Sequence, residues 1–288
     1  MFIAAVFTVV SLGLMVLCLN IVGPKVLPMV LTFVLSFALM HIVYLFVYYL
    51  LSLPCDRSRP IEKQNRHSRA CCAGVAGMLS AYERMTLIPR GLAKVPQDRR
   101  FLFVCNHRSM FDPLVVMDKL AALNISFVSK PSNLKIPMVG TIAHQAGFLA
   151  IDRDNDRKAL QTILTAADYI KRDVCSIGIY PEGHRSKDGQ LLPFHAGSFK
   201  IAQKAKCPLV IACIRGTEGR KGFLFRDNHV VVLDILDVLE PEQVTAMSTQ
   251  ELSDYSRSLM EAALAQPLAE DPAPALEELL LRSREDEA

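Results

Sequence analysis

The stretch NDRKALQTILTAADYIKRDVCSIGIY, residues 155–180, decides the class of fold. Its first part predicts an amphipathic helix over residues 155–172, because apolar side chains recur there at helical spacing: Leu160, Ile163, Leu164, Ala167 and Ile170. Its second part, residues 174–180, is a short apolar run of the kind that forms a buried strand. A helix that passes directly into a buried strand is half of the repeating unit of an α/β domain.

The same alternation of helix and strand extends on both sides of this stretch. Short apolar runs predict strands over residues 101–105, 125–129, 147–151, 208–214 and 229–236. Helices are expected over residues 71–86, 113–123, 137–146 and 198–206. We therefore predict an α/β fold with a mixed, largely parallel central sheet flanked by helices. In such sheets the functional side chains lie in loops beyond the carboxyl ends of the strands.

The N-terminal part of the chain differs from the rest in composition. Residues 1–53 contain no Asp, Glu or Arg, and their only Lys is Lys25. Residues 2–22 and 26–53 are two apolar runs, and the first alone would make about 31 Å of helix, enough to cross a hydrocarbon core. We predict a two-helix membrane hairpin that either spans the bilayer or enters one leaflet and returns. A cleaved signal peptide fits less well, because a basic start and a small-residue cleavage site are missing.

Charged residues begin directly after the second apolar run. Residues 55–100 carry ten basic and four acidic side chains, a net charge of +6. By the positive-inside tendency, the following domain should face the cytoplasm at the plasma membrane. Residues 261–288 carry eight acidic side chains and two Arg, which predicts a short helix and a tail without chemistry. We divide the chain into a membrane hairpin (1–54), an α/β domain (55–265) and an acidic C-terminal tail (266–288).

Overall composition excludes several classes of protein. With 51% hydrophobic and 21% charged residues, the chain of 288 residues is too apolar for a disordered protein. Its apolar excess is confined to the N-terminal runs, unlike that of a many-spanning transporter. The eight Cys residues include no C-x-x-C pair and no Cys/His spacing typical of zinc, so buried free thiols in a reducing compartment are expected. A formal net charge of +3 gives no reason to expect nucleic-acid binding, and no metal or organic cofactor is expected.

The first group of residues whose side chains could take part in catalysis is Asn-His-Arg-Ser-Met-Phe-Asp, residues 106–112, which directly follows a predicted strand. His107 can accept a proton from a hydroxyl, while Asp112 fixes the tautomer of the imidazole and stabilises the imidazolium. Asp112 also precedes Pro113, a pairing typical of a helix start, so a role in helix capping alone is an alternative.

The second group is Tyr-Pro-Glu-Gly-His-Arg-Ser, residues 180–186, which also follows a predicted strand. Gly183 permits a tight turn and a close approach of the backbone to a ligand. Arg185 offers a planar guanidinium suited to phosphate. The alternative is an ordinary polar turn that carries a surface ion pair.

Together the two groups resemble the NHxxxxD and FPEGTRS motifs of the glycerophospholipid acyltransferases, the lysophosphatidic acid acyltransferase family, in its bacterial form. Three weaker blocks are similar to further motifs of that family. Gly147 and Asp152-Arg153 match parts of one, and Lys130 resembles the lysine of another. Residues 208–213 are similar to its last apolar motif, with Ala212 in place of proline. The resemblance covers residues 80–240, approximately.

The resemblance implies transfer of a fatty acyl group from acyl-CoA or acyl-carrier protein, as co-substrate, to the sn-2 hydroxyl of 1-acyl-sn-glycerol 3-phosphate. His107 would be the general base and Asp112 its orienting partner, and no acyl-enzyme is needed. Partners would be membrane lipids and lysophosphatidic acid. Substrate-binding roles would fall to the residues that match the remaining motif positions: Lys130, Arg153, Glu182, Gly183, Arg185 and Ser186.

Within this set, Lys130, Arg153 and Arg185 would hold the phosphate. Glu182 would either bind the glycerol end or order the loop, and Gly183 would let the backbone approach the ligand.

Two departures from the family pattern affect the acceptor more than the reaction. His184 stands where the family most often has Thr, and Tyr180 where it has Phe. Alternatives are therefore an acyltransferase for glycerol 3-phosphate or another lyso-lipid, a thioesterase or lipid hydrolase, and a catalytically silent lipid-binding homologue.

Overall fold

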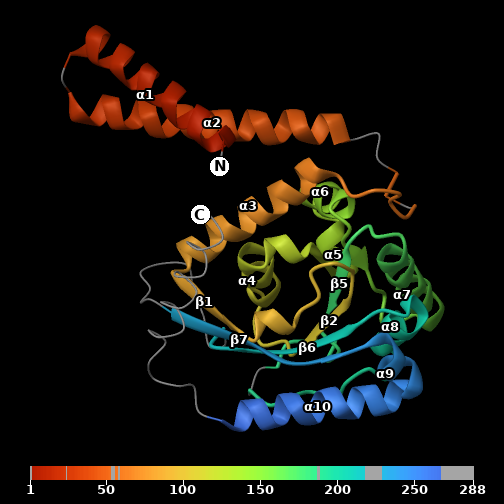
Figure 1. The fold of residues 1–288 in the computed structure, drawn as a ribbon. Coiled ribbons are helices and arrows are strands. Elements are labelled where there is room, and N and C mark those ends of the chain that lie inside the picture. The colour runs from red at the N-terminus through yellow and green to blue at the C-terminus, as the bar shows by residue number, and fades with distance from the viewer. Residues whose placement is uncertain are drawn as a thin grey trace.

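The computed structural model describes residues 2–23, 25–52, 56–57, 59–186, 189–217 and 229–266. An N-terminal pair of helices lies beside an α/β domain in which one sheet is covered by helices on both faces (Figure 1). The last described helix ends at Ala265, and the predicted division into three parts stays a prediction. The predicted acidic tail lies outside the described residues, apart from Gln266.

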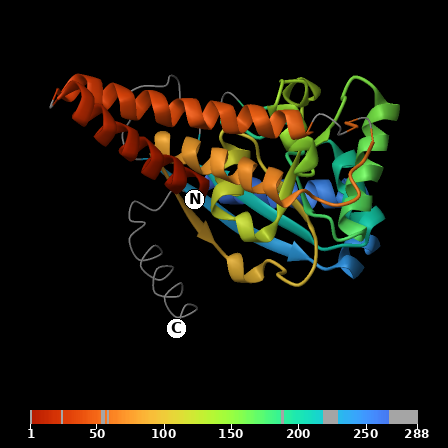
Figure 2. The same ribbon diagram turned by 90° about the horizontal axis from the view of Figure 1, so that it is seen from above.

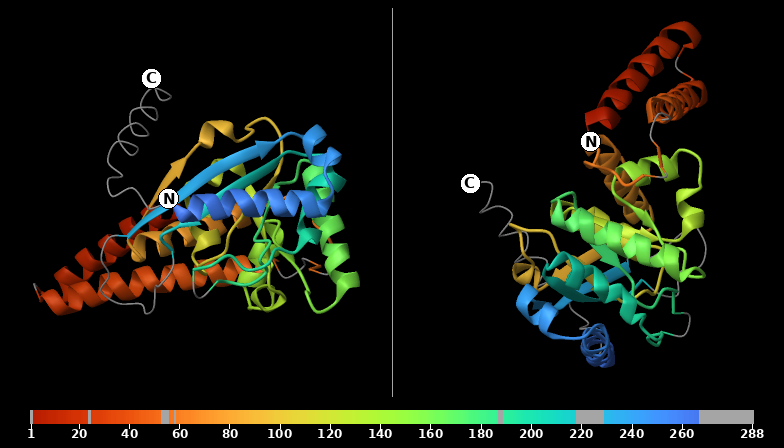
Figure 3. Two further views of the ribbon diagram at one scale, coloured as in Figure 1. Left: turned by 90° about the horizontal axis from the view of Figure 1, so that it is seen from below. Right: turned by 90° about the vertical axis from the view of Figure 1, so that its right-hand side faces the viewer.

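The N-terminal pair is a helical hairpin, as predicted, made of α1 (Phe2–Val22) and α2 (Val26–Ser52). Apolar side chains are exposed along both helices; Ile21 and Val26, for example, are each 75% exposed. The segment Val26–Tyr44, with a mean hydropathy of 2.3, is long and apolar enough to cross a membrane, and none of it is buried in the protein. Tyr44 of α2 hydrogen-bonds to His67, which joins the hairpin to the domain. Figures 2 and 3 show the hairpin on the side of the domain that carries α3 (Arg66–Tyr82).

The sheet has seven strands in the order β1-β7-β6-β2-β5-β3-β4. All neighbours are parallel except β6 and β7, so the predicted mixed, largely parallel sheet is confirmed. Strand β2 lies between β5 and β6, both parallel to it. The strands are β1 (Met85–Arg90), β2 (Leu102–Cys105), β3 (Ile125–Ser129), β4 (Leu149–Ala150), β5 (Ser176–Ile179), β6 (Leu209–Arg215) and β7 (His229–Leu239).

Helices cover the two faces of the sheet unequally. Leu102 and Val104 of β2 point to a core shared with α7, α8, α9 and α10, whereas Phe103 and Cys105 point to a core shared with α4. This alternation is the period of two that a strand imposes. Figure 3 shows α10 lying along the sheet on the first face. The helices of the domain are α3, α4 (Asp112–Lys119), α5 (Pro131–Leu134), α6 (Val139–Gln145), α7 (Asp156–Lys171), α8 (Lys200–Ala205), α9 (Pro241–Ala246) and α10 (Thr249–Ala265).

Three short 3₁₀ turns complete the described elements: η1 (Leu92–Lys94), η2 (Ala121–Leu123) and η3 (Ala196–Phe199). Because η2 follows α4, the single helix predicted over residues 113–123 is in fact an α-helix that tightens into a 3₁₀ turn. The strand predicted over residues 147–151 is shortened to two residues, because β4 pairs only with the end of β3 at the sheet edge.

The prediction for residues 83–86 was wrong. The helix expected over residues 71–86 ends at Tyr82, and Arg84 adopts a left-handed backbone with φ of 50°. Strand β1 then begins at Met85 and pairs along its whole length with β7. Pairing with a distant strand therefore determined the conformation of a segment that local periodicity assigned to a helix.

Candidate active site

The candidate site lies where three neighbouring strands end. The loop 106–112 follows β2, the loop 180–186 follows β5, and residues 216–217 follow β6. Because these strands are parallel and adjacent, their carboxyl ends meet at one edge of the sheet. Both motif loops that the sequence singled out are thus brought together.

His107 and Asp112 form a hydrogen-bonded pair. Nδ1 of His107 lies 2.8 Å from Oδ2 of Asp112. The Asp112 side chain is fully buried, and that of His107 is 18% exposed. When Nδ1 carries the proton and donates it to the carboxylate, Nε2 is left as a proton acceptor on the more open side of the ring.

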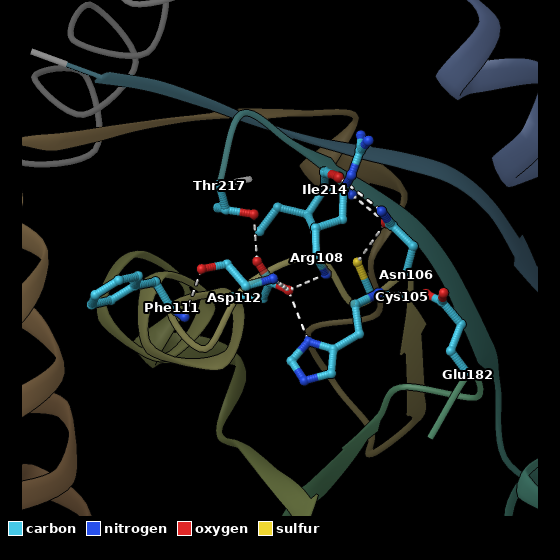
Figure 4. A network of polar contacts seen from close by, with 10 residues as sticks. Cys105, Asn106, Arg108, Phe111, Asp112, Glu182, Ile214 and Thr217 are labelled. Atoms are coloured by element: carbon cyan, nitrogen blue, oxygen red, sulfur yellow. Dashed lines mark hydrogen bonds and ion pairs between the residues drawn. The ribbon is translucent and has the colours of Figure 1, made fainter. Parts of the chain in front are cut away.

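The carboxylate of Asp112 is held by three further donors (Figure 4). The backbone N–H groups of Arg108 and Ser109 donate to Oδ2 at 2.7 and 2.8 Å. The hydroxyl of Thr217 donates to Oδ1 at 2.5 Å. Asp112 stands in the first turn of α4, but the N-cap is Phe111 and no side-chain capping bond forms. The carboxylate therefore points back into the loop toward His107, and helix capping does not account for it.

Asn106 fastens the same loop to the neighbouring strand. Its side-chain amide donates to the carbonyl oxygen of Ile214 at 2.9 Å, and its side-chain oxygen accepts from the N–H of Ile214 at 2.7 Å. Asn106 is fully buried. This pair of bonds resembles the backbone pairing between two strands and continues the contact with β6 just beyond the end of β2. It therefore fixes the position of the backbone directly before His107.

A stack of aromatic rings supports the imidazole from one side. The rings of His107 and Tyr180 lie 4.3 Å apart between centroids and 18° from parallel. Phe127 also stacks on Tyr180, with 5.5 Å between ring centroids and 7° between ring planes. The hydroxyl of Tyr180 is buried and has no hydrogen-bond partner among the described residues. Burial raises the pKa of Tyr180 well above its usual value, so this hydroxyl stays protonated.

Glu182 links the two motif loops. Its Oε1 accepts from the N–H of His107 at 2.6 Å, and its Oε2 accepts from the N–H of Leu192 at 2.9 Å. Burial raises the pKa of Glu182, while these two N–H bonds act in the opposite direction. Each oxygen thus accepts one backbone N–H bond, and these bonds connect the two loops; whether Glu182 also binds the glycerol end stays a prediction. Ser186 adds a third link, because its N–H donates to the carbonyl oxygen of His107 at 2.9 Å.

The basic side chains of the motifs reach the protein surface. Gly183 has a left-handed backbone with φ of 72°, and a Cβ there would lie 3.5 Å from Nε of Arg153. Partial burial lowers the pKa of Arg153. Lys130 and Arg185 are exposed. Across the described ranges, no ion pair or hydrogen bond of the side chain occupies Arg153, Arg185 or Lys130, and none joins Lys130 or Arg185 to the His107 loop.

Thr217 is the site residue that the sequence interpretation missed. It is fully buried and lies two residues beyond the end of β6. The rule that sites gather at strand ends would have pointed to it, once β6 was known to neighbour β2. Within the part of the chain that the structure describes, no group of three or more His, Cys, Asp or Glu residues is arranged to hold a metal ion.

Comparison with known proteins gives consistent results. The profile of the Acyltransferase family matches residues 87–215. The 1-acyl-sn-glycerol-3-phosphate acyltransferases of Salmonella typhimurium and Escherichia coli (strain K12) are each 30% identical to this chain over 165 residues, which is 57% of this chain and 67% of theirs. That of Haemophilus influenzae is 29% identical over 177 residues, 60% of this chain and 73% of its own length.

The fold is shared with a protein of known structure. The crystal structure of the 1-acyl-sn-glycerophosphate (LPA) acyltransferase PlsC from Thermotoga maritima matches with a TM-score of 0.58 and 19% sequence identity. The match covers 92% of this chain and 100% of that one.

Proposed function

The chain belongs to the family of 1-acyl-sn-glycerol-3-phosphate acyltransferases, and on this premise we propose that its site transfers an acyl group at a membrane surface. The acceptor is the sn-2 hydroxyl of 1-acyl-sn-glycerol 3-phosphate, and the product is phosphatidic acid. The observation that carries the proposal is the pair of His107 and the fully buried Asp112, 2.8 Å apart, with Nε2 of the imidazole left to accept a proton.

His107 acts as the general base. Its Nε2 takes the proton of the sn-2 hydroxyl while the hydroxyl oxygen attacks the carbonyl carbon of an acyl thioester. The tetrahedral intermediate then collapses, the carbon–sulfur bond breaks, and the imidazolium returns the proton to the leaving sulfur. The Asp112 carboxylate balances the positive charge on the imidazole between these steps, and its three other donors keep it in position.

The basic side chains bind the phosphate of the acceptor. Within the described residues, no hydrogen bond or ion pair holds the side chain of Arg153, Arg185 or Lys130, so a phosphate does not have to break one, although Asp154 lies next to Arg153 in the sequence. An Arg can bind phosphate through two parallel N–H bonds, which fixes the direction of the acceptor as well as its charge. Glycine suits position 183 because its backbone is left-handed, with φ of 72°, and because a Cβ there would lie only 3.1 Å from the ring of His195.

The hairpin holds this site at the bilayer. Apolar side chains are exposed along α1 and α2, and water is a poor solvent for such a surface. The ten basic side chains of residues 55–100 favour the cytoplasmic side of the plasma membrane for the α/β domain. Acyl-CoA and acyl-carrier protein are both suitable donors, since each presents a thioester.

The test is acyl transfer by the purified full-length protein in detergent. Wild type and His107→Ala receive 1-acyl-sn-glycerol 3-phosphate with acyl-CoA, and separately with acyl-carrier protein, and phosphatidic acid and free fatty acid are both quantified. We expect phosphatidic acid from wild type and a loss of at least about 10²-fold in the variant, the scale of general-base catalysis. Free fatty acid alone would indicate a hydrolase, and an equally active variant would remove His107 from the mechanism.

A further inference from the structure

We propose that His195 binds the acceptor phosphate together with Arg153, and so determines preference for acceptors that carry a phosphate group. The inference rests on the proposed function, and it adds a residue that lies outside both sequence motifs. It follows from three observations. The His195 side chain lies beside Gly183, the side chains of Arg153 and His195 have no hydrogen-bond or ion-pair partner within the described residues, and the loop 180–186 leads from His107 toward both of them.

The backbone around His195 fixes its place against the second motif loop. The N–H of His195 donates to the carbonyl oxygen of Pro181 at 2.9 Å. Three residues earlier, the N–H of Leu192 donates to Glu182. On the other side, the N–H of Ser198 donates to the carbonyl oxygen of His195 at 2.9 Å, where η3 begins. The residue is thus anchored through its backbone, while its side chain is exposed.

The imidazole of His195 and the guanidinium of Arg153 meet at Gly183. A Cβ built on Gly183 would lie 3.1 Å from both Cδ2 and Nε2 of His195 and 3.5 Å from Nε of Arg153. Two nitrogen-bearing groups from separate segments therefore flank one point on the loop. Glycine at this point, in its left-handed conformation, leaves the space between them free of side-chain atoms.

The side chains of Arg153 and His195 are both available to bind a ligand. Over the described ranges, no hydrogen bond or ion pair engages the side chain of Arg153 or of His195. The nearest buried carboxylate, Glu182, uses both of its oxygens on backbone N–H groups. The charge that acts on Arg153 in its folded environment comes from its sequence neighbour Asp154. Two nitrogen-bearing side chains that converge, with no hydrogen-bonded or ion-paired partner of their own within the described residues, suit an anion.

Phosphate needs more than one donor, and His195 can supply one in either protonation state. The imidazolium donates from Nε2, and so does the neutral ring in the tautomer that carries the proton there. The loop 180–186 also connects the general base to the two basic side chains. Glu182 accepts from the N–H of His107, and the next residue, Gly183, is flanked by Arg153 and His195. An acceptor lying along this loop can place its hydroxyl at His107 and its phosphate at the other end.

The experiment measures acceptor kinetics of His195→Leu and His195→Gln in the full-length protein. For His195→Leu we expect KM for 1-acyl-sn-glycerol 3-phosphate to rise about tenfold, the scale of one hydrogen bond to a charged group, with kcat changed less than about twofold. The inhibition constant of soluble sn-glycerol 3-phosphate should rise by a similar factor. His195→Gln keeps an N–H donor and should restore part of the loss.

The matched control is Lys171→Leu. Lys171 is exposed and stands in the last turn of α7, which leads to the amino end of β5, at the opposite edge of the sheet from the site. It should change neither constant, which separates a local contact from a general loss of positive charge. Thermal unfolding of each variant shows whether the fold is kept.

Two results would overturn the proposal. One is a KM and an inhibition constant that stay unchanged in His195→Leu while wild type is active. The other is a loss that is confined to kcat, or that is equal with 1-acylglycerol, an acceptor without phosphate. If wild type itself produces no phosphatidic acid, the proposed function has failed instead, and the two failures are distinguishable. If wild type is inactive, a comparison of glycerol 3-phosphate binding by wild type and His195→Leu still tests the role of His195.

Discussion

The two sides of the site are built in opposite ways. On one side, the carboxylate of Asp112 receives three hydrogen bonds besides that of His107, and Asn106 and Glu182 are also fully engaged. On the other side, which we call the phosphate side after its proposed role (Lys130, Arg153, Arg185 and His195), no side chain has a hydrogen-bond or ion-pair partner within the described residues. In the proposed mechanism, the reacting groups are thus held in advance by the protein, while the groups proposed to bind the phosphate are left for that ligand to satisfy.

Among the variants that would test this contrast between the two sides, we expect the largest change in kinetics on the phosphate side. Arg153→Leu should raise KM for 1-acyl-sn-glycerol 3-phosphate about 10- to 100-fold, because a charge-assisted hydrogen bond contributes about 1.5–3 kcal/mol. Since the His107 side is untouched, kcat should change little. Steady-state kinetics with the acceptor varied at saturating donor measure both constants. A kcat that falls while KM stays constant would place Arg153 among the groups that act on the transition state.

A smaller effect, and of the opposite kind, is expected at Thr217. Thr217→Val keeps the shape of the side chain but leaves Oδ1 of the buried Asp112 without its donor. We expect kcat to fall about tenfold with KM unchanged, and the free energy of unfolding to fall by about 1–3 kcal/mol.

Thr217→Ser supplies the control for that prediction, because it restores the hydroxyl. Recovery of kcat in this variant would assign the loss to the hydrogen bond rather than to packing. A rise in the KM of Thr217→Val would contradict the division between the two sides.

The smallest effect is expected at Tyr180. Tyr180→Phe removes a buried hydroxyl that has no partner among the described residues but keeps the ring stacked on His107. The free energy of unfolding should stay the same or rise by up to about 1 kcal/mol, and kcat should change less than about twofold. Chemical denaturation and initial rates measure the two quantities. A tenfold loss of activity would show that the hydroxyl finds a partner once substrate is bound.

Local sequence pattern predicted those parts of the fold that local forces determine. The helix over residues 155–172 and the strand that follows it have clear periodicity, and both are present. Strand β1 was missed because Met85–Arg90 becomes a strand only through its pairing with β7, far along the chain. Helix α10 was also missed, although Ser248 and Glu251 form a capping box that is readable from sequence.

The residues of the candidate site likewise fall into those that a local motif predicts and those that only distant contacts reveal. His107 and Asp112 lie in one short motif, so their spacing already indicated a pair, and the structure places them in contact. The contributions of Thr217 and His195 depend on which strands and loops are neighbours, and a single sequence does not contain that information in a local pattern. The two backbone N–H groups that donate to Glu182 come from residues 107 and 192, and no local pattern in the sequence predicted these contacts.

The bonds that fasten the His107 loop have a consequence for folding. Glu182 is 75 residues from His107, Thr217 is 105 residues from Asp112, and Ile214 is 108 residues from Asn106. Contacts between such distant positions form late, because the intervening chain must first be ordered. A ribosome that has released only the two motifs has made a chain without a working site, since β6 and Thr217 have not yet emerged. Enzymatic activity should therefore be among the last properties to return on refolding, after helical structure has already recovered.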